Sequence, residues 1–194
     1  MPSERYPSVD VTRDSQPRDV PFRLEVEKVR DFSPTAPARI RCSFENRSST
    51  KQTVGIGPIQ PFSNIWSKGE SPLVLVPTER DVQRYALGTD EQIIPDQPVD
   101  GCWQTNTVRF VRHDVLRWRS FASSECIQTE YAILHYPEQE ILDATMDKWF
   151  GPKTESDVCL PAGEYRFEES FTPKFRANAT WKEFTWGFTL TIGE

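Results

Sequence analysis

Several residue types that carry catalytic or metal chemistry are scarce in this chain of 194 residues, which holds two histidines, four cysteines and two methionines. His113 and His135 belong to no His-Glu-x-x-His motif, and no Cys-x-x-Cys pair is present, so the sequence encodes no recognisable zinc site. The chain also lacks a Gly-x-Ser-x-Gly motif and a glycine-rich dinucleotide loop. We therefore expect no cofactor, no metal and no enzymatic activity.

Positive charge is also in short supply, because 23 Lys and Arg residues face 29 Asp and Glu residues, for a formal net charge of −6. This balance argues against a nucleic-acid partner. No segment approaches the roughly 20 apolar residues of a membrane span, and residues 1–20 contain no apolar stretch typical of a secretory signal. The sequence as written therefore predicts no membrane span, and a cytoplasmic location unless a leader precedes it.

Aromatic residues, in contrast, make up 12% of the chain, enough to build an apolar core. Apolar and polar residues alternate with a period of two in several segments, most clearly in residues 184–192, and Pro- and Gly-rich turns separate these segments. The segments expected to form strands are residues 22–26, 39–45, 53–59, 73–76, 108–111, 126–136, 165–168 and 184–192. The pattern predicts an all-β, immunoglobulin-like antiparallel β-sandwich of about seven to nine strands.

The domain organisation follows from where this alternation starts and stops. Residues 1–20 carry prolines among charges and are expected to form a flexible N-terminal arm, followed by a single domain over residues 21–194. Residues 80–100 look irregular and acidic. The spacing of apolar residues in 138–150 predicts a short helical excursion that Gly151 and Pro152 would end.

A tyrosine corner is indicated where Tyr165 follows Gly163 at the start of a late strand, with Phe167 pointing into the core. In immunoglobulin domains, the position that Phe167 takes is a cysteine paired with the second strand. Cys42 on that strand is therefore expected to be a buried free thiol, and Trp186 to belong to the core.

Cys102 and Cys159 both border loops and form the best candidate disulfide, provided that the protein is exported. Such a bond would stabilise the fold by about 4 kcal/mol in the chain-entropy model. Cys126 has no evident mate except Cys42.

Exposed tryptophans are the remaining indication of a binding surface. Trp66, Trp103 and Trp118 lie beside polar, loop-like sequence, and Arg117 and Arg119 flank Trp118 in the one local basic patch. These side chains are candidate partner contacts, because Trp and Arg are enriched in binding hot spots. The alternative is that the rings fold down over the ends of the sandwich and that the arginines form a solvated strand face.

Two glycosylation sequons, at Asn46 and Asn178, fall in expected turns and would matter only in an exported chain.

The order of several segments resembles that of uncharacterised haloarchaeal immunoglobulin-like proteins, over most of residues 22–192. The segments are residues 38–46, 57–58, 61–63, 73–77, 100–103, 130–134 and 159–167. This resemblance implies the fold and a location at the surface of an archaeal, halophilic cell, or secretion. A fainter similarity to the intracellular proteinase inhibitors of bacilli rests on residues 44–46 and 161–164.

The sequence thus favours a non-enzymatic binding module that presents loops to a protein or glycan partner. The alternatives are a proteinase inhibitor that offers an extended loop from residues 51–65 or 81–99, and a purely structural cell-surface module.

Overall fold

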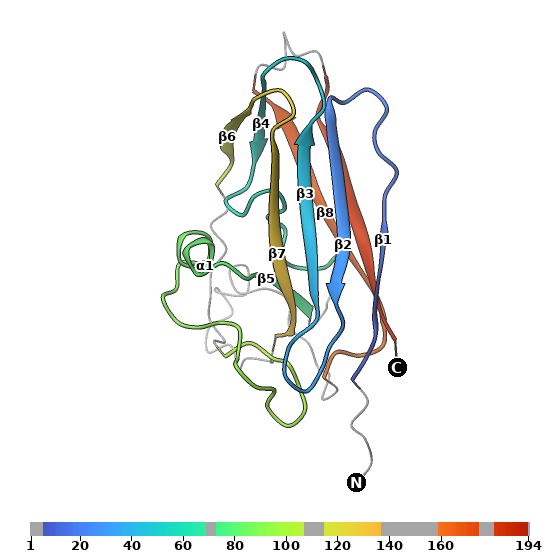
Figure 1. Cartoon of the computed structure of the whole chain (residues 1–194), viewed down its shortest axis with the longest axis vertical. Coiled ribbons are helices and arrows are strands. Elements are labelled where there is room, and N and C mark those ends of the chain that lie inside the picture. Colours follow the sequence, from blue (N-terminus) through green and yellow to red (C-terminus); the bar gives the residue numbers. More distant parts are fainter. Residues whose placement is uncertain (1–5, 69–72, 107–114, 137–158, 175–180, 194) are drawn as a thin grey trace, which may run out of the picture.

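The fold is a two-sheet antiparallel β-sandwich, as expected from the alternation (Figure 1). The computed structural model describes residues 6–68, 73–106, 115–136, 159–174 and 181–193, and these residues form nine strands and one α-helix. The helix predicted at residues 138–150 and the strand predicted at residues 108–111 lie outside the described residues.

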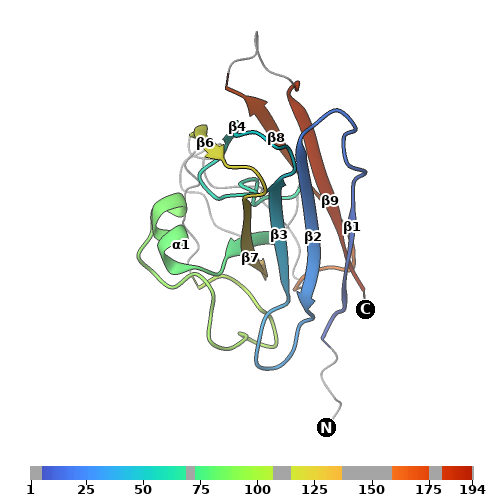
Figure 2. The ribbon, with the colours of Figure 1, turned by 45° about the horizontal axis from the view of Figure 1, so that its top comes forward.

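The first sheet has five strands in the order β1-β9-β8-β4-β6, and the second has four in the order β2-β3-β7-β5. The first sheet contains β1 (Val9–Arg13), β4 (Gln52–Ile56), β6 (Arg117–Phe121), β8 (Gly163–Pro173) and β9 (Phe184–Ile192). The second sheet contains β2 (Phe22–Arg30), β3 (Arg39–Asn46), β5 (Leu73–Pro77) and β7 (Cys126–His135). Helix α1 (Arg80–Leu87) lies on the same side of the sandwich as β6 (Figures 1 and 2).

The core lies between the sheets and is built by the alternation of buried and half-buried residues, which is regular along β3. Phe44 at the centre contacts Phe22 of its own sheet at 4.6 Å between ring centroids, and Phe121 and Phe171 of the other sheet at 5.0 and 5.3 Å. All five residues of β5 are buried, so this strand is covered on both faces.

The predicted tyrosine corner is confirmed. Tyr165 donates a hydrogen bond from its hydroxyl to the carbonyl oxygen of Pro161, while Phe167 is fully buried and stacks on Phe188. Trp186 is buried in the core, and Cys42 is a buried free thiol whose pKa is raised by burial. This thiol therefore acts as a small apolar side chain.

The predicted disulfide is also present, because Cys102 and Cys159 are bonded at an S–S distance of 2.03 Å. The bond joins the loop after α1 to the turn before β8 and closes a loop of 57 residues. Cys126 is an exposed free thiol.

The expectation of a flexible arm over residues 1–20 is wrong for residues 9–13, which form β1 and pair with β9 in register from Val9 with Ile192 to Arg13 with Phe188. The alternation here is short, and Val9 is its only buried residue. The residues after β1 also contact the sandwich. The side-chain amide of Gln16 donates a hydrogen bond to the carbonyl oxygen of Leu24 and accepts one from the Leu24 N–H, so it satisfies backbone groups at the edge of β2.

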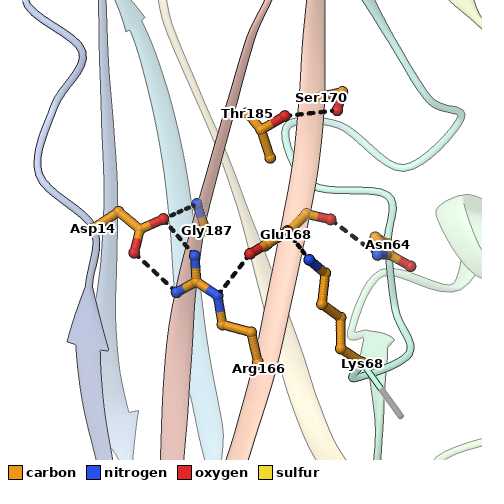
Figure 3. Close-up of polar contacts among 8 residues, drawn as sticks. All are labelled: Asp14, Asn64, Lys68, Arg166, Glu168, Ser170, Thr185 and Gly187. Carbon is orange, nitrogen blue, oxygen red and sulfur yellow. Dashed lines mark hydrogen bonds and ion pairs between the residues drawn. The ribbon is translucent and has the colours of Figure 1, made fainter.

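Asp14 fastens this N-terminal segment to the outer face of the first sheet (Figure 3). Its two carboxylate oxygens accept hydrogen bonds from the terminal nitrogens of Arg166 at 2.9 and 2.5 Å, and one also accepts from the N–H of Gly187 at 3.0 Å. Arg166 donates from Nε to Glu168, which also pairs with Lys68. The hydrogen bonds to Arg166 hold the pKa of the Asp14 carboxyl below its usual range.

This arrangement requires a glycine at position 187, since an added Cβ would lie 2.1 Å from the carbonyl oxygen of Phe167 and 3.0 Å from an Arg166 nitrogen.

Helix α1 corrects the expectation that residues 80–100 are irregular throughout. Gln83, Ala86 and Leu87 supply its buried face, and Gly88 ends it in the left-handed conformation at φ 65° with its N–H bonded to the carbonyl oxygen of Arg84. The helix is only eight residues long, so it shows little periodicity.

Thiol titration tests the cysteine assignment. Without reductant, we expect a thiol-specific reagent to react quickly with one group in the native protein, Cys126, and with two groups after unfolding, when Cys42 becomes exposed. The variant Cys126→Ser removes the fast group as a control. Four reactive thiols in the unfolded, unreduced protein would contradict the disulfide.

Gly187→Ala should lower the free energy of unfolding by about 2–4 kcal/mol, because the backbone of β8 would have to move.

Asp14→Asn should lower the free energy of unfolding by about 1 kcal/mol, since the ion pair with Arg166 is partly exposed. Its effect should be present above pH 4 or thereabouts and fade as the pH falls, because the folded-state pKa of Asp14 is depressed. Denaturant unfolding measures both effects, with Asp10→Asn in the preceding strand β1 as the control. A neutral Gly187→Ala would refute the steric argument.

Candidate functional site

Strand β6 lies at one end of its sheet among the described strands, and exposed apolar side chains lie just before it and in its first residues. Val115, Leu116 and Trp118 are 49%, 52% and 45% exposed. Contiguous apolar side chains beside an edge strand are unusual on a monomeric protein surface and are typical of an interaction site. The predicted contact Trp118 is therefore accessible.

The indole of Trp118 lies on the outer face of the sheet, over a position of β4 that has no side chain. Its register partner on β4 is Gly55, where an added Cβ would lie 2.9 Å from the indole Cζ3 and 3.1 Å from Leu116 Cδ1. Gly55 thus lets the indole and Leu116 lie close against the backbone of β4. Arg117 and Arg119, the neighbours of Trp118 in the strand, point to the opposite face.

On that opposite face, a groove of about 620 Å³ runs between β6, the first part of β7 and α1. Its lining residues are Pro58, Gln60, Glu79, Asp81, Val82, Tyr85, Arg117, Arg119, Ile127, Gln128 and Thr129. The β6 wall carries two arginines and the α1 wall carries two carboxylates, so the groove has opposite charges on its two sides.

The groove exists because β5 is shorter than β7. Their pairing ends where Pro77 meets Tyr131, so residues 127–129 of β7 have no described strand beside them on that side. The carbonyl oxygen of Gln60 takes part of this space and accepts a hydrogen bond from the Thr129 hydroxyl at 2.6 Å. The rest stays open.

The two arginines have different roles. Arg119 is anchored: it donates to Gln60 Oε1 at 2.7 Å and to Glu125 Oε1 at 3.0 Å, and its guanidinium lies 5.0 Å from the Phe121 ring centre. Arg117 is exposed, lies 4.2 Å from the ring centre of Tyr85 and makes no ion pair with any described residue. Arg117 and Tyr85 thus form an accessible cationic and aromatic pair above the groove.

Asn46 fixes the far end of β6. Its side chain is fully buried and donates from Nδ2 to the carbonyl oxygens of Thr50, Phe121 and Ala122 at 2.9, 3.2 and 2.9 Å. Its Oδ1 accepts from the N–H and hydroxyl of Ser48 at 3.0 and 2.8 Å. The Asn46 sequon therefore offers no free amide for a glycan in the folded protein, and the Asn178 sequon lies outside the described residues.

The structure does not bring the other predicted contacts to this site. Trp103 is 1% exposed and donates its indole N–H to the carbonyl oxygen of Ser33, so its prediction as a partner contact is corrected. Trp66 is half-buried against Tyr136 at 4.8 Å between ring centroids and bridges to Val74 of β5. Both rings cover parts of the sandwich, as the alternative interpretation had it.

Sequence reasoning did not single out Tyr85, Leu116, Glu79 and Asp81 as site residues. A signal for Tyr85 is present in the sequence, because Gly88 marks the end of a helix. In that helix Gln83, Ala86 and Leu87 form the buried face, and Tyr85 lies outside this face. Nothing in the sequence places this helix beside β6.

Comparison with protein-family models, with curated proteins and with solved structures finds no match for this chain. Within the described ranges, no helix is both long enough and apolar enough to cross a membrane. The same residues contain no group of three or more His, Cys, Asp or Glu side chains placed to hold a metal ion.

Replacing Asn46 tests its role in holding β6. Asn46→Ala should lower the free energy of unfolding by about 2–4 kcal/mol, because buried carbonyl oxygens lose their donor. Ser48→Ala, which removes one hydroxyl from the same turn, should cost about 1 kcal/mol. Denaturant unfolding compares the two, and equal small losses would contradict a central role for Asn46.

Proposed function

We propose that the protein is a non-enzymatic binding module that holds an extended segment of a partner protein in the groove beside β6. The observation that carries the proposal is the coincidence of three features at one place. A strand that ends its sheet among the described strands, an exposed apolar cluster formed by Val115, Leu116 and Trp118, and a groove of about 620 Å³ meet along residues 115–119.

An extended peptide suits this place because an edge strand offers unpaired backbone groups to another strand. Side chains of an added strand alternate between two faces, as those of β6 do. One set would reach the apolar cluster around Trp118 on the outer face, and the other would enter the groove. A protein segment therefore fits better than a glycan, because a glycan has no peptide backbone that could pair with β6.

The groove also sets the charge of the expected segment. Arg117 is available to pair with an acidic side chain of the partner segment. Asp81, on the α1 side of the groove, is placed to pair with a basic side chain of that segment. We expect the partner segment to carry an acidic residue beside β6 and apolar residues at alternate positions. Because the groove has both charges, the net charge of the segment should matter little.

The proteinase-inhibitor alternative finds less support in the segments proposed for it. Residues 51–65 contain β4, and beyond it Ile59, Phe62 and Ile65 are buried. Residues 81–99 begin with α1, so only residues 88–99 remain as a loop. Residues 51–65 therefore offer no long exposed loop, and residues 88–99 are the segment through which an inhibitor would have to act.

The cellular setting is also proposed. The disulfide between Cys102 and Cys159 is compatible with an exported protein, and the haloarchaeal resemblance supports a cell-surface module. The immunoglobulin-like assignment remains a prediction from the tyrosine corner and the two-sheet arrangement.

Selection from a displayed library of random linear peptides tests the proposal. We expect enriched peptides to combine alternating apolar residues with an acidic one, and to bind in the micromolar range. Arg117→Gln should weaken their binding by about tenfold or more, and Trp118→Ala likewise. Fluorescence anisotropy of labelled peptides measures the dissociation constants.

Arg13→Gln is the matched control, because Arg13 is an exposed strand arginine of the same sheet, paired with Glu25 far from β6. It should leave peptide binding unchanged. The proposal fails if no enriched peptide depends on Arg117. It also fails if glycans on an array bind while peptides do not, or if the protein inhibits a protease stoichiometrically through residues 88–99.

A further inference from the structure

A second cavity, of about 480 Å³, lies where the ends of β2 and β3 meet the residues around α1. Three arginines line it, Arg30, Arg39 and Arg80, against a single carboxylate, Asp96. Such a concentration of positive charge is unexpected in a chain whose formal net charge is −6. It shares no lining residue with the groove beside β6.

The strand register brings two of these arginines together. Elsewhere on the second sheet opposite charges face each other, as in the pairs Arg23 with Glu45 and Glu27 with Arg41. After an irregularity between Lys28 and Arg30, the register sets Arg30 opposite Arg39. Like charges directly opposite each other destabilise a sheet, so this pair departs from the pattern at the cavity.

One neighbouring carboxylate, Glu130, offsets this pair only in part, because it is shared with Arg41. Glu130 lies 2.5 Å from Arg41 through one oxygen and forms a longer ion pair with Arg39, at 3.6 Å, through the other. Arg39 Nε is buried without a hydrogen-bond partner in the described structure, and Arg30 donates only from Nε, to the carbonyl oxygen of Pro37. Arg30 forms no ion pair with the described residues, and its pKa is lowered by burial and by Arg39.

The third arginine and the polar residues complete the cavity. Arg80 donates to the carbonyl oxygen of Asp90 and likewise has no carboxylate partner among the described residues. Asp96, the one carboxylate in the wall, accepts a hydrogen bond from the side-chain amide of Gln92. The hydroxyl groups of Thr35 and Thr78 add neutral donors and acceptors to the wall.

We propose that this cavity binds a small, hydroxylated acid through its oxyanion group, a carboxylate or a phosphate, held by Arg30 and Arg39. A guanidinium presents a planar fork of donors that matches both oxyanions. The bound anion would supply the charge that the like-charged pair lacks, and the threonine and glutamine side chains would contact hydroxyl groups. The cavity is larger than a phosphate ion alone requires, which favours a sugar acid or a sugar phosphate.

Isothermal titration calorimetry with four probes tests this site: glucuronate, glucose 6-phosphate, inorganic phosphate and glucose. We expect saturable binding of at least one anion with a dissociation constant below about 1 mM at low salt, weakened by added salt. Glucose should bind at least about tenfold more weakly than the charged sugars. A preference for glucuronate or for glucose 6-phosphate assigns the oxyanion as carboxylate or phosphate.

Variants locate the site. Arg30→Gln and Arg39→Gln should each weaken binding by about tenfold or more, and Arg30→Lys should fall in between because it keeps the charge without the fork. Arg23→Gln, on the same sheet and paired with Glu25, is the matched control and should change binding less than about twofold. Thermal unfolding checks that each variant is folded.

The proposal is overturned if no anion binds saturably up to about 10 mM, or if glucose binds as tightly as glucuronate and glucose 6-phosphate. Unchanged binding in both Arg30→Gln and Arg39→Gln would also refute it. Because the two sites share no lining residue, failure here leaves the peptide groove intact, and Arg117→Gln should not affect the anion.

Discussion

The buried amide of Asn46 is the interaction on which this arrangement of the sandwich depends. Asn46 ends β3 in the second sheet, and its Nδ2 donates to carbonyl oxygens at the end of β6 in the first. The two sheets are therefore joined at this end by hydrogen bonds from one side chain as well as by apolar packing. A buried amide with every donor and acceptor used holds its partners in a single geometry. The edge strand that borders the groove is fixed in this way, while the disulfide from Cys102 to Cys159 ties the loop after α1 to the start of β8.

Most of the strands were predictable because their alternation is long and one face is buried. Strand β9 matches its expected bounds, β3, β5 and β7 match to within one residue, and β2 starts as expected at Phe22 but continues four residues further, to Arg30. Strand β1 was not predictable, because only Val9 of its residues is buried and the pairing with β9 comes from distant sequence. Strand β6 was also missed: Arg-Trp-Arg-Ser at an exposed edge shows no apolar alternation, since only Phe121 of its residues is buried.

The candidate sites show the same division between local and long-range information. Arg117, Trp118 and Arg119 were found because they are adjacent in the sequence. Tyr85 reaches Arg117 only through the packing of α1. The facing pair of Arg30 and Arg39 depends on a strand irregularity that no local pattern encodes. The disulfide and the tyrosine corner were predictable because each has a local signature, whereas the burial of Trp103 was not, since its indole bonds to a carbonyl 70 positions away.

Amide hydrogen exchange, followed by NMR with and without a peptide selected for dependence on Arg117, tests most directly whether β6 receives an added strand. If a strand is added, amides within Arg117–Phe121 should exchange at least about tenfold more slowly in the complex. The amides of β2, which ends the other sheet, should remain unchanged. Protection that leaves β6 unaffected, or that appears along β2 instead, would contradict the account.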